Sequence, residues 1–148
     1  MAGLFFSAVT GEVSTGTSQK TILQLVAATN TRVKIREWSF SFIGTSNTAQ
    51  PIRCQLMSQT DAGTMTALTL KKKISSDTET LQTTAQHTAT AEPTTGTAFK
   101  AEEVHPQTGY TWQAPFGGEE IIVGGARLGF VVTAGATTSA EVRADCEE

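Results

Sequence analysis

The chain has 148 residues, of which 39% are hydrophobic and 17% are charged, and its formal net charge is -3. This length most simply forms one domain with a full hydrophobic core. The acidic balance argues against a surface for nucleic-acid phosphates, and no apolar run reaches the roughly 18 residues of a membrane helix, so neither partner is expected.

The first segment, residues 1–19, is rich in Gly, Ser and Thr and contains one short apolar run, Leu4, Phe5 and Phe6. It lacks the basic start and the long apolar core of a signal peptide, which predicts a soluble protein made in the cytoplasm. We expect an extended N-terminal arm at residues 1–19 and a single β-sandwich domain at residues 20–148. The apolar run either anchors the arm on a partner or covers the base of its own sandwich.

Nine strands are predicted after the arm, from apolar alternation and from the turn residues between the strands. Their ranges are 20–27, 31–43, 51–58, 64–73, 83–91, 98–104, 119–124, 127–134 and 139–146. A β-turn is expected at Pro93-Thr94-Thr95-Gly96, and Gly124-Gly125 is expected to close a tight hairpin. About 8–9 short strands at this spacing predict an all-β fold, an antiparallel β-sandwich of the jelly-roll type.

The strand at residues 31–43 changes the phase of its apolar residues once. These residues are Val33 and Ile35 before the change, and Trp38, Phe40 and Phe42 after it. A single change of phase indicates a β-bulge, because one extra residue bends the strand and returns its apolar side chains to the same face. We therefore place a bulge at Arg36-Glu37 and expect this strand to form the centre of the core.

Candidate catalytic and metal-binding residues are few. His87 and His105 lie far apart in sequence, and Glu102-Glu103-Val104-His105 alone does not bring together the ligands of a metal site. Cys54 and Cys146 fall in phase with apolar neighbours, which predicts buried thiols, although a disulfide between them stays open. We expect no enzyme activity, no metal and no cofactor. A cupin-type enzyme is the catalytic alternative, and it would require clustered His and carboxylate ligands.

Tyr110 and Trp112 fall on one face of a short strand in the segment that also contains Thr111 and Gln113. If both rings are exposed, they form an aromatic platform that can stack on a sugar ring. The alternative is that both rings fill the mouth of the sandwich, because large aromatic side chains are mostly buried.

Several features together suggest a known group of proteins. They are the segment before Lys20, the strand with Arg36-Glu37-Trp38, the turn at Glu92-Pro93-Thr94-Thr95-Gly96, the loop from Val104-His105-Pro106 to Trp112, and the glycine pair before Arg127-Leu128-Gly129-Phe130. With these features the chain resembles the small, Thr-, Ala- and Gly-rich jelly-roll proteins that decorate or cement the heads of tailed bacteriophages.

The resemblance implies a structural virion protein that is made in the host cytoplasm and binds the outer surface of a phage capsid. Its partners would be the major capsid protein and its own copies in a homotrimer, with Leu4, Phe5 and Phe6 as candidate contact residues. The alternative from another class is a carbohydrate- or receptor-binding β-sandwich module, such as part of a tail fibre, which would use the Tyr110 and Trp112 platform. Fold alone does not decide between these functions.

Overall fold

The computed structural model describes residues 3–43 and 50–148, and this part of the chain forms thirteen β-strands. The strands are β1 (Phe5–Val9), β2 (Val13–Ser14), β3 (Lys20–Val26), β4 (Val33–Ile43), β5 (Ile52–Gln59), β6 (Thr64–Leu68), β7 (Lys71–Lys72), β8 (Thr84–Ala91), β9 (Thr95–Val104), β10 (Tyr110–Gln113), β11 (Glu120–Ile122), β12 (Arg127–Thr133) and β13 (Ser139–Glu147).

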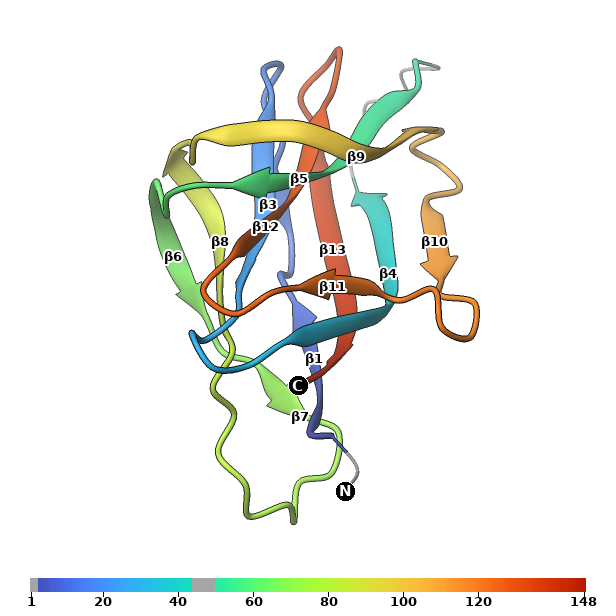
Figure 1. Ribbon diagram of the computed structural model, residues 1–148. Coiled ribbons are helices and arrows are strands. Elements are labelled where there is room, and N and C mark those ends of the chain that lie inside the picture. Colours follow the sequence, from blue (N-terminus) through green and yellow to red (C-terminus); the bar gives the residue numbers. More distant parts are fainter. Residues whose placement is uncertain (1–2, 44–49) are drawn as a thin grey trace.

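The strands form two antiparallel sheets that pack as a sandwich (Figure 1). Sheet A has the order β10-β4-β13-β1-β7, with β11 also paired to β4 and β2 to β13, and sheet B has the order β6-β8-β3-β12-β5-β9. The pairs β1–β13, β3–β12, β4–β10 and β5–β9 are nested within one another along the chain. This nesting of early strands with late strands is the jelly-roll order, so the predicted fold class is confirmed.

The predicted bulge lies where the sequence placed it. Asp145 of β13 pairs with Glu37, whereas the next residue, Cys146, pairs with Ile35, so Arg36 is the extra residue of β4. Side chains on both sides of the bulge therefore enter the core, and Ile35 and Trp38 are both buried. The bulge gives one long strand two straight parts that both face sheet B.

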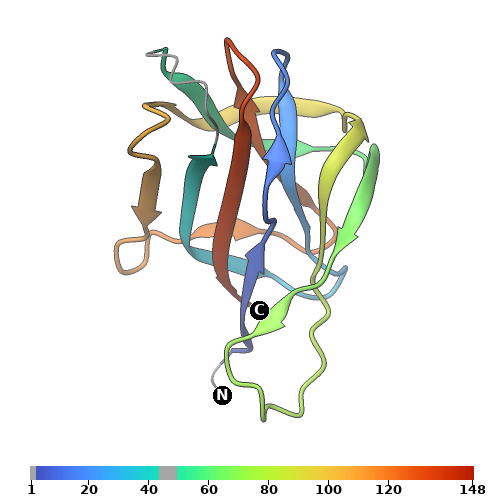
Figure 2. The ribbon, with the colours of Figure 1, turned by 180° about the vertical axis from the view of Figure 1, so that it is seen from behind.

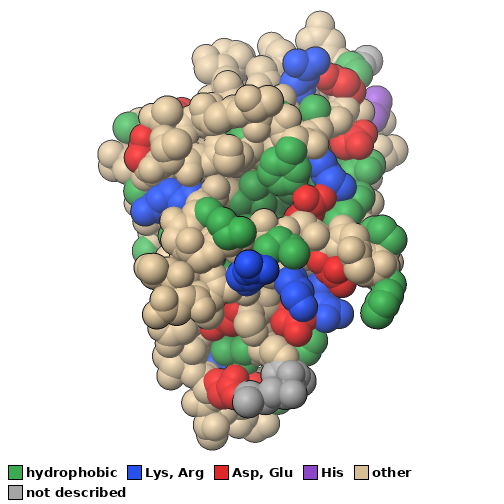
Figure 3. Space-filling model, in the orientation of Figure 1, with side chains coloured by type: hydrophobic (Ala, Val, Ile, Leu, Met, Phe, Trp, Pro, Cys, Tyr) green, Lys and Arg blue, Asp and Glu red, His purple; other side chains and the backbone are tan. Residues whose placement is uncertain are grey.

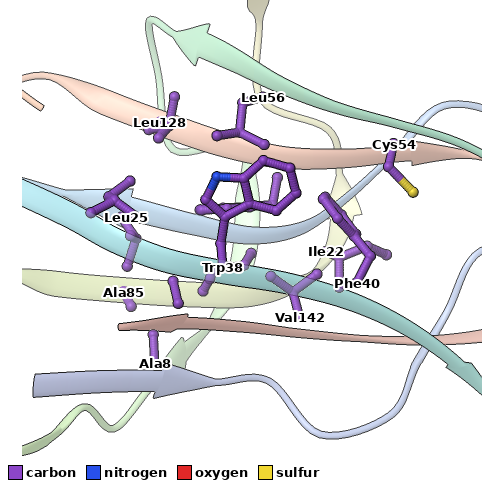
Figure 4. Packing of buried hydrophobic residues seen from close by; sticks show 14 of the residues in the cluster. Ala8, Ile22, Leu25, Trp38, Phe40, Cys54, Leu56, Ala85, Leu128 and Val142 are labelled. Carbon is purple, nitrogen blue, oxygen red and sulfur yellow. The ribbon is translucent and has the colours of Figure 1, made fainter. Parts of the chain in front are cut away.

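Trp38 lies at the centre of the core. It is 1% exposed, and its ring centroid lies 5.5 Å from that of Phe40 and 6.3 Å from that of Phe130. Figure 4 shows its indole between β4 and the strands of sheet B. Burial of each such side chain stabilises the fold by about 1.5–3 kcal/mol, so this aromatic cluster makes the largest local contribution to the core.

The segment predicted as an N-terminal arm is part of the sandwich. β1 pairs with β13 over its whole length, and Figure 2 shows β1 between β13 and β7. Its alternate residues point inward, so Phe6 and Ala8 are fully buried. Leu4 exchanges two backbone hydrogen bonds with Glu148, of 2.8 and 3.0 Å. The prediction of an extended arm is therefore wrong for the described residues of this segment.

Three predicted connections differ from the observed ones, the first being the β-turn expected at residues 93–96, of which Thr95 and Gly96 already belong to β9. The predicted strand 64–73 divides into β6, which pairs with β8 in sheet B, and β7, which pairs with β1 in sheet A. Gly124-Gly125 joins β11 of sheet A to β12 of sheet B, so it does not close a hairpin. The glycines are still required, because Gly125 has a φ of 79° and a Cβ on Gly124 would lie 2.2 Å from the carbonyl oxygen of Thr29.

The sandwich has two edges of different construction (Figure 1). At one edge, β6 of sheet B continues along the chain into β7 of sheet A. At the other edge, β9 ends sheet B while β10 and β11 lie at the end of sheet A, and among the described residues no backbone pairing joins β9 to either of them. Side chains must close this second edge, which we call the open edge.

Candidate functional site

The open edge is closed by three side chains from three strands. Lys100 of β9 places its Nζ 2.8 Å from Oε1 of Glu120 in β11 and 3.7 Å from the ring centroid of Trp112 in β10. The strand registers place these residues together. Lys100 pairs with Leu56 in sheet B, Trp112 pairs with Trp38 in sheet A, and Leu56 and Trp38 belong to the same core cluster between the sheets. We call Lys100, Trp112 and Glu120 the edge clamp. A cation over an indole and a half-buried ion pair both favour closure of the edge.

Tyr110 extends the closure along β10. Burial raises the pKa of its phenol, and the negative charge of Glu102 and a hydrogen bond to that carboxylate raise it further. Because Glu102 belongs to β9, this contact is a second link between the two sheets at the open edge. The phenol of Tyr110 therefore stays protonated at neutral pH.

The predicted aromatic platform of Tyr110 and Trp112 is not an exposed stacking surface. The two residues share a strand face, as the sequence indicated, but that face points toward Trp38 and Phe40 of β4. The rings of Trp112 and Trp38 are stacked, with centroids 5.8 Å apart, and Lys100 lies over the Trp112 ring. Both rings pack at the mouth of the sandwich, which corrects the platform interpretation in favour of its alternative.

Exposed apolar side chains gather outside the edge clamp. Phe99 of β9 is 51% exposed, and Ile121 and Val123, in and just after β11, are each 54% exposed. Figure 3 shows hydrophobic side chains grouped between β9 and β11. These three are among the seven exposed large apolar side chains in the described part of the chain, and Phe116, in the β10–β11 loop, is fully exposed. Such a concentration marks an interaction surface, which we call the edge patch.

A pocket of about 130 Å³ lies within the edge patch. Its apolar lining includes Phe99, Ile121, Val123 and Leu128, and its polar lining consists of Ser58, Glu120 and Arg127. Arg127 donates a hydrogen bond of 3.1 Å to the Gln24 side chain. The pocket is thus a mainly apolar hollow that also carries the Arg127 guanidinium and the Glu120 carboxylate, of which the carboxylate is already paired with Lys100, and its apolar part suits a partner's hydrophobic side chain.

Sequence reasoning missed the edge patch because exposure at a sheet edge is decided by topology. The strands that carry Phe99 and Ile121 were predicted, but nothing in their alternation shows that both lie at the end of a sheet. One signal was present in Pro115-Phe116-Gly117-Gly118, where an aromatic residue stands among turn residues. A large side chain in such a turn has no strand face that would carry it into the core.

Leu4, Phe5 and Phe6 have different environments. Leu4 is 4% exposed and Phe6 is 0% exposed, so neither can contact a partner in the folded protein, which corrects their assignment as contact residues. Phe5 points to the outer face of sheet A, where the Arg36 guanidinium lies 5.0 Å from its ring centroid. The apolar run therefore covers its own sandwich, and only Phe5 remains partly accessible.

The outer face of sheet A carries a ladder of ion pairs beside Phe5. The pairs are Arg36 with Glu147, Arg143 with Glu37, and Lys73 with Asp145. Burial raises the pKa of Asp145, but hydrogen bonds from Ser7 and Lys73 and the charges of Lys73 and Arg143 outweigh it, so the pKa lies below its usual range. Asp145 thereby links β13 to β1 and to the residue that follows β7.

A polar cavity of about 380 Å³ lies beside the segment between β2 and β3. Its lining includes Ser18, Gln19, Lys20, Thr90 and Glu92. The Glu92 carboxylate accepts a hydrogen bond of 2.8 Å from the Thr21 backbone amide, and it lies 3.6 Å from the Lys20 ammonium. Hydroxyl, amide and charged groups are therefore available to a polar ligand, although the lining contains no aromatic ring on which a sugar could stack.

The two cysteines are buried and free. Burial raises the pKa of both thiols, and Glu103 and Glu102 add to the effect at Cys54, as Asp145 does at Cys146. Both thiols are therefore protonated and poorly nucleophilic at neutral pH.

Two features are absent from residues 3–43 and 50–148. These residues contain no group of three or more His, Cys, Asp or Glu side chains that could hold a metal ion. They also contain no helix of the length and apolar character needed to cross a membrane.

Comparison with known proteins gives no counterpart: no protein-family model, no curated protein and no solved structure matches the chain. Its function must therefore be argued from its own surface.

Proposed function

We propose that this is a structural virion protein that binds the outer surface of a phage capsid as a decoration or cement protein, in the form of a homotrimer. The observation that carries the proposal is the edge patch, with Phe99, Ile121 and Val123 more than half exposed. Exposed apolar groups of this kind are costly in a free monomer and are favourable when a protein partner covers them.

The construction of the body supports the same role. Its strands are nested, so that β1 and β13, the first and last, lie side by side in one sheet. The Glu148 carboxylate accepts hydrogen bonds from the backbone amides of Gln82 and Thr83, which ties the long connection between β7 and β8 to the C-terminal end. A protein that reinforces a capsid needs such a body, in which the first and last strands are paired with each other. In this proposal the major capsid protein and sister copies are the partners.

The proposal is tested by binding to purified phage heads that lack the protein. Wild-type protein is expected to co-sediment with heads and to saturate at a fixed ratio to the major capsid protein. Phe99→Glu should weaken this binding at least about 30-fold, whether the edge patch contacts the capsid directly or joins the copies of the trimer that binds it, since loss of a central apolar anchor costs about 2 kcal/mol or more.

A matched control is Ile74→Glu, because Ile74 is 56% exposed and lies in the connection between β7 and β8, outside the edge patch. Its binding should equal that of the wild type. The absence of wild-type binding to any decoration-free head tested would count against the capsid role, and equal loss in both variants would count against the edge patch as its site.

A carbohydrate- or receptor-binding module is the second candidate, and the polar cavity favours it. Gln19 and Thr90 supply amide and hydroxyl groups, and Glu92 supplies a carboxylate, at one hollow. In this case the protein should bind members of a glycan array, and Gln19→Ala should remove the binding while Trp112→Phe leaves it intact. Loss of glycan binding in Trp112→Phe alone would favour an aromatic platform instead of the polar cavity.

A further inference from the structure

We infer that copies of this chain associate head to tail, with Phe116 of one copy inserted into the apolar pocket of the edge patch on the next copy. The inference deepens the proposed function and rests on its self-association: it names the two surfaces that meet. Phe116 is fully exposed, so it does not fill the pocket of its own chain.

Phe116 is presented by a defined turn. The Gly118 amide donates a hydrogen bond of 2.8 Å to the carbonyl oxygen of Pro115, which closes a β-turn with Phe116 and Gly117 at its corners. Gly117 has a φ of 78°, as the third position of a type II turn requires. The base of the loop is held by Ala114, whose amide donates to the carbonyl oxygen of Arg36 at 2.7 Å. A preformed turn reduces the entropy that is lost when the side chain is bound.

The pocket has the size and the lining that an aromatic ring requires. Its volume is about 130 Å³, and Phe99, Ile121, Val123 and Leu128 line it. For comparison, a cavity of about 150 Å³ lined by aliphatic and aromatic side chains accommodates benzene. A phenyl ring is therefore a suitable occupant, and Phe116 is the phenylalanine that the chain itself exposes most.

The charges beside the two surfaces are complementary. Glu119 follows Phe116 by three residues, and Arg127 lies at the rim of the pocket. Within the described part of the chain neither takes part in an ion pair, and Arg127 donates a hydrogen bond to the amide side chain of Gln24. Insertion of Phe116 would bring the Glu119 carboxylate toward the Arg127 guanidinium on the next copy; Arg127 also interacts with Asp61 of its own chain, and the Glu120 carboxylate in the pocket is already paired with Lys100.

A head-to-tail contact restricts the type of assembly, whereas a reciprocal exchange of Phe116 between two copies would give a twofold dimer. The Phe116 turn precedes β11 and the pocket lies along and beyond it, so each copy offers two different surfaces. Contact between two different surfaces is heterologous, and it produces a ring when the rotation between copies closes. A ring of three copies is the closed form that agrees with the proposed trimer.

The experiment uses one variant for each surface. Phe116→Glu destroys the inserted side chain and leaves the pocket, whereas Val123→Glu spoils the pocket and leaves Phe116. Both positions are exposed, so circular dichroism should show unchanged folding. By light scattering after size exclusion, each variant should be a monomer under conditions where the wild type and Ile74→Glu are oligomers, with association at least about 30-fold weaker.

Mixing the two variants tests the head-to-tail arrangement. Phe116→Glu still has a pocket and Val123→Glu still has Phe116, so a concentrated one-to-one mixture should form a heterodimer, seen by native mass spectrometry, that cannot close into a ring. Overturning results are a mixture that stays monomeric, or a wild-type mass in either variant. In the second case the trimer stands and only this interface fails. A wild type that is monomeric even near 1 mM overturns both the interface and the solution trimer, and head binding then decides the capsid role.

Discussion

The two edges of the sandwich are closed in different ways. At one edge the backbone itself passes from sheet B to sheet A through β6 and β7, and β7 adds to β1 by regular pairing. At the open edge the chain also passes between the sheets, through the loop of residues 105–109 from β9 to β10, but no strand there pairs across the edge, and the side chains of Lys100, Trp112 and Glu120 hold the sheets together. Closure by side chains leaves the backbone N–H and C=O groups of the edge strands, and some apolar side chains, available to a partner. Closure by strand pairing satisfies those backbone groups within the protein.

The open edge is also built so that a partner cannot simply extend the sheet. β9 carries Lys100, Glu102 and Glu103, and its pairing with β5 has two shifts of register. Charged residues and bulges on an edge strand discourage the addition of another strand. Contact at this edge is therefore expected to use the apolar side chains of the edge patch, which require a partner of matching shape.

The largest expected effect comes from breaking the backbone-closed edge. Deletion of residues 1–9 removes β1, with which β7 pairs, and it takes Phe6 and Ala8 out of the core. Replacement of one buried phenylalanine by alanine already costs about 3–5 kcal/mol, within a total stability of about 5–15 kcal/mol. The truncated chain should therefore lose cooperative urea unfolding, as followed by tryptophan fluorescence.

Two single substitutions in β1 show how much of its contribution to stability comes from the packing of its buried side chain. Phe6→Ala should lower the free energy of unfolding by about 3–5 kcal/mol, while Val9→Ala, at an exposed position of the same strand, should change it by less than about 0.5 kcal/mol. A truncated protein that unfolds with the wild-type midpoint would restore the interpretation of this segment as a dispensable arm.

The next effect comes from the side-chain-closed edge. Trp112→Ala removes the ring that stacks on Trp38 and supports Lys100, and it should lower the free energy of unfolding by about 3 kcal/mol. Urea denaturation measures the change, with Trp112→Phe as a milder control. Wild-type stability together with loss of glycan binding would instead show that the ring serves a ligand.

The sequence predicts those features of the fold that depend on neighbouring residues, and it does not predict those that depend on pairing between strands far apart in the chain. The bulge at Arg36 follows from local alternation, and the core positions around Trp38 follow from the same pattern. The burial of Phe6 depends on pairing with β13, more than 130 residues away, and alternation over five residues was too short to outweigh a Gly- and Ser-rich composition. The division of residues 64–73 between two sheets has no local signal, since both parts are strands.

The edge patch shows the same limit at the candidate site. Phe99 and Ile121 become neighbours because β9 ends one sheet and β11 lies at the end of the other. The alternation of apolar residues in a strand does not show whether that strand lies at the end of its sheet, so the exposure of these side chains could not be predicted. Phe116 is different, because its position between Pro115 and Gly117 is a local signal that an aromatic side chain lies outside the core.

A smaller effect concerns the edge clamp. Lys100→Met keeps an apolar chain over Trp112 but removes the ammonium, which leaves the Glu120 carboxylate half-buried and unpaired. The expected loss of stability is about 1–2 kcal/mol. A double-mutant cycle with Glu120→Gln should give a coupling energy of about 0.5–1 kcal/mol, whereas additive effects would mean that the ion pair contributes nothing to closure.

The smallest effect is the pH dependence of the ladder that joins β13 to the backbone-closed edge. The pKa of Asp145 is lower in the folded protein than its usual value, so its ionised form stabilises the fold. This contribution is fully present above pH about 4, where the carboxyl is ionised in both states, and it is lost as the pH falls through the folded pKa. Asp145→Asn should therefore lose less stability than the wild type when urea unfolding is compared at pH 7 and pH 3. Equal losses would mean that Ser7 and Lys73 do not hold this carboxylate, and that pairing of β1 with β13 alone maintains the edge.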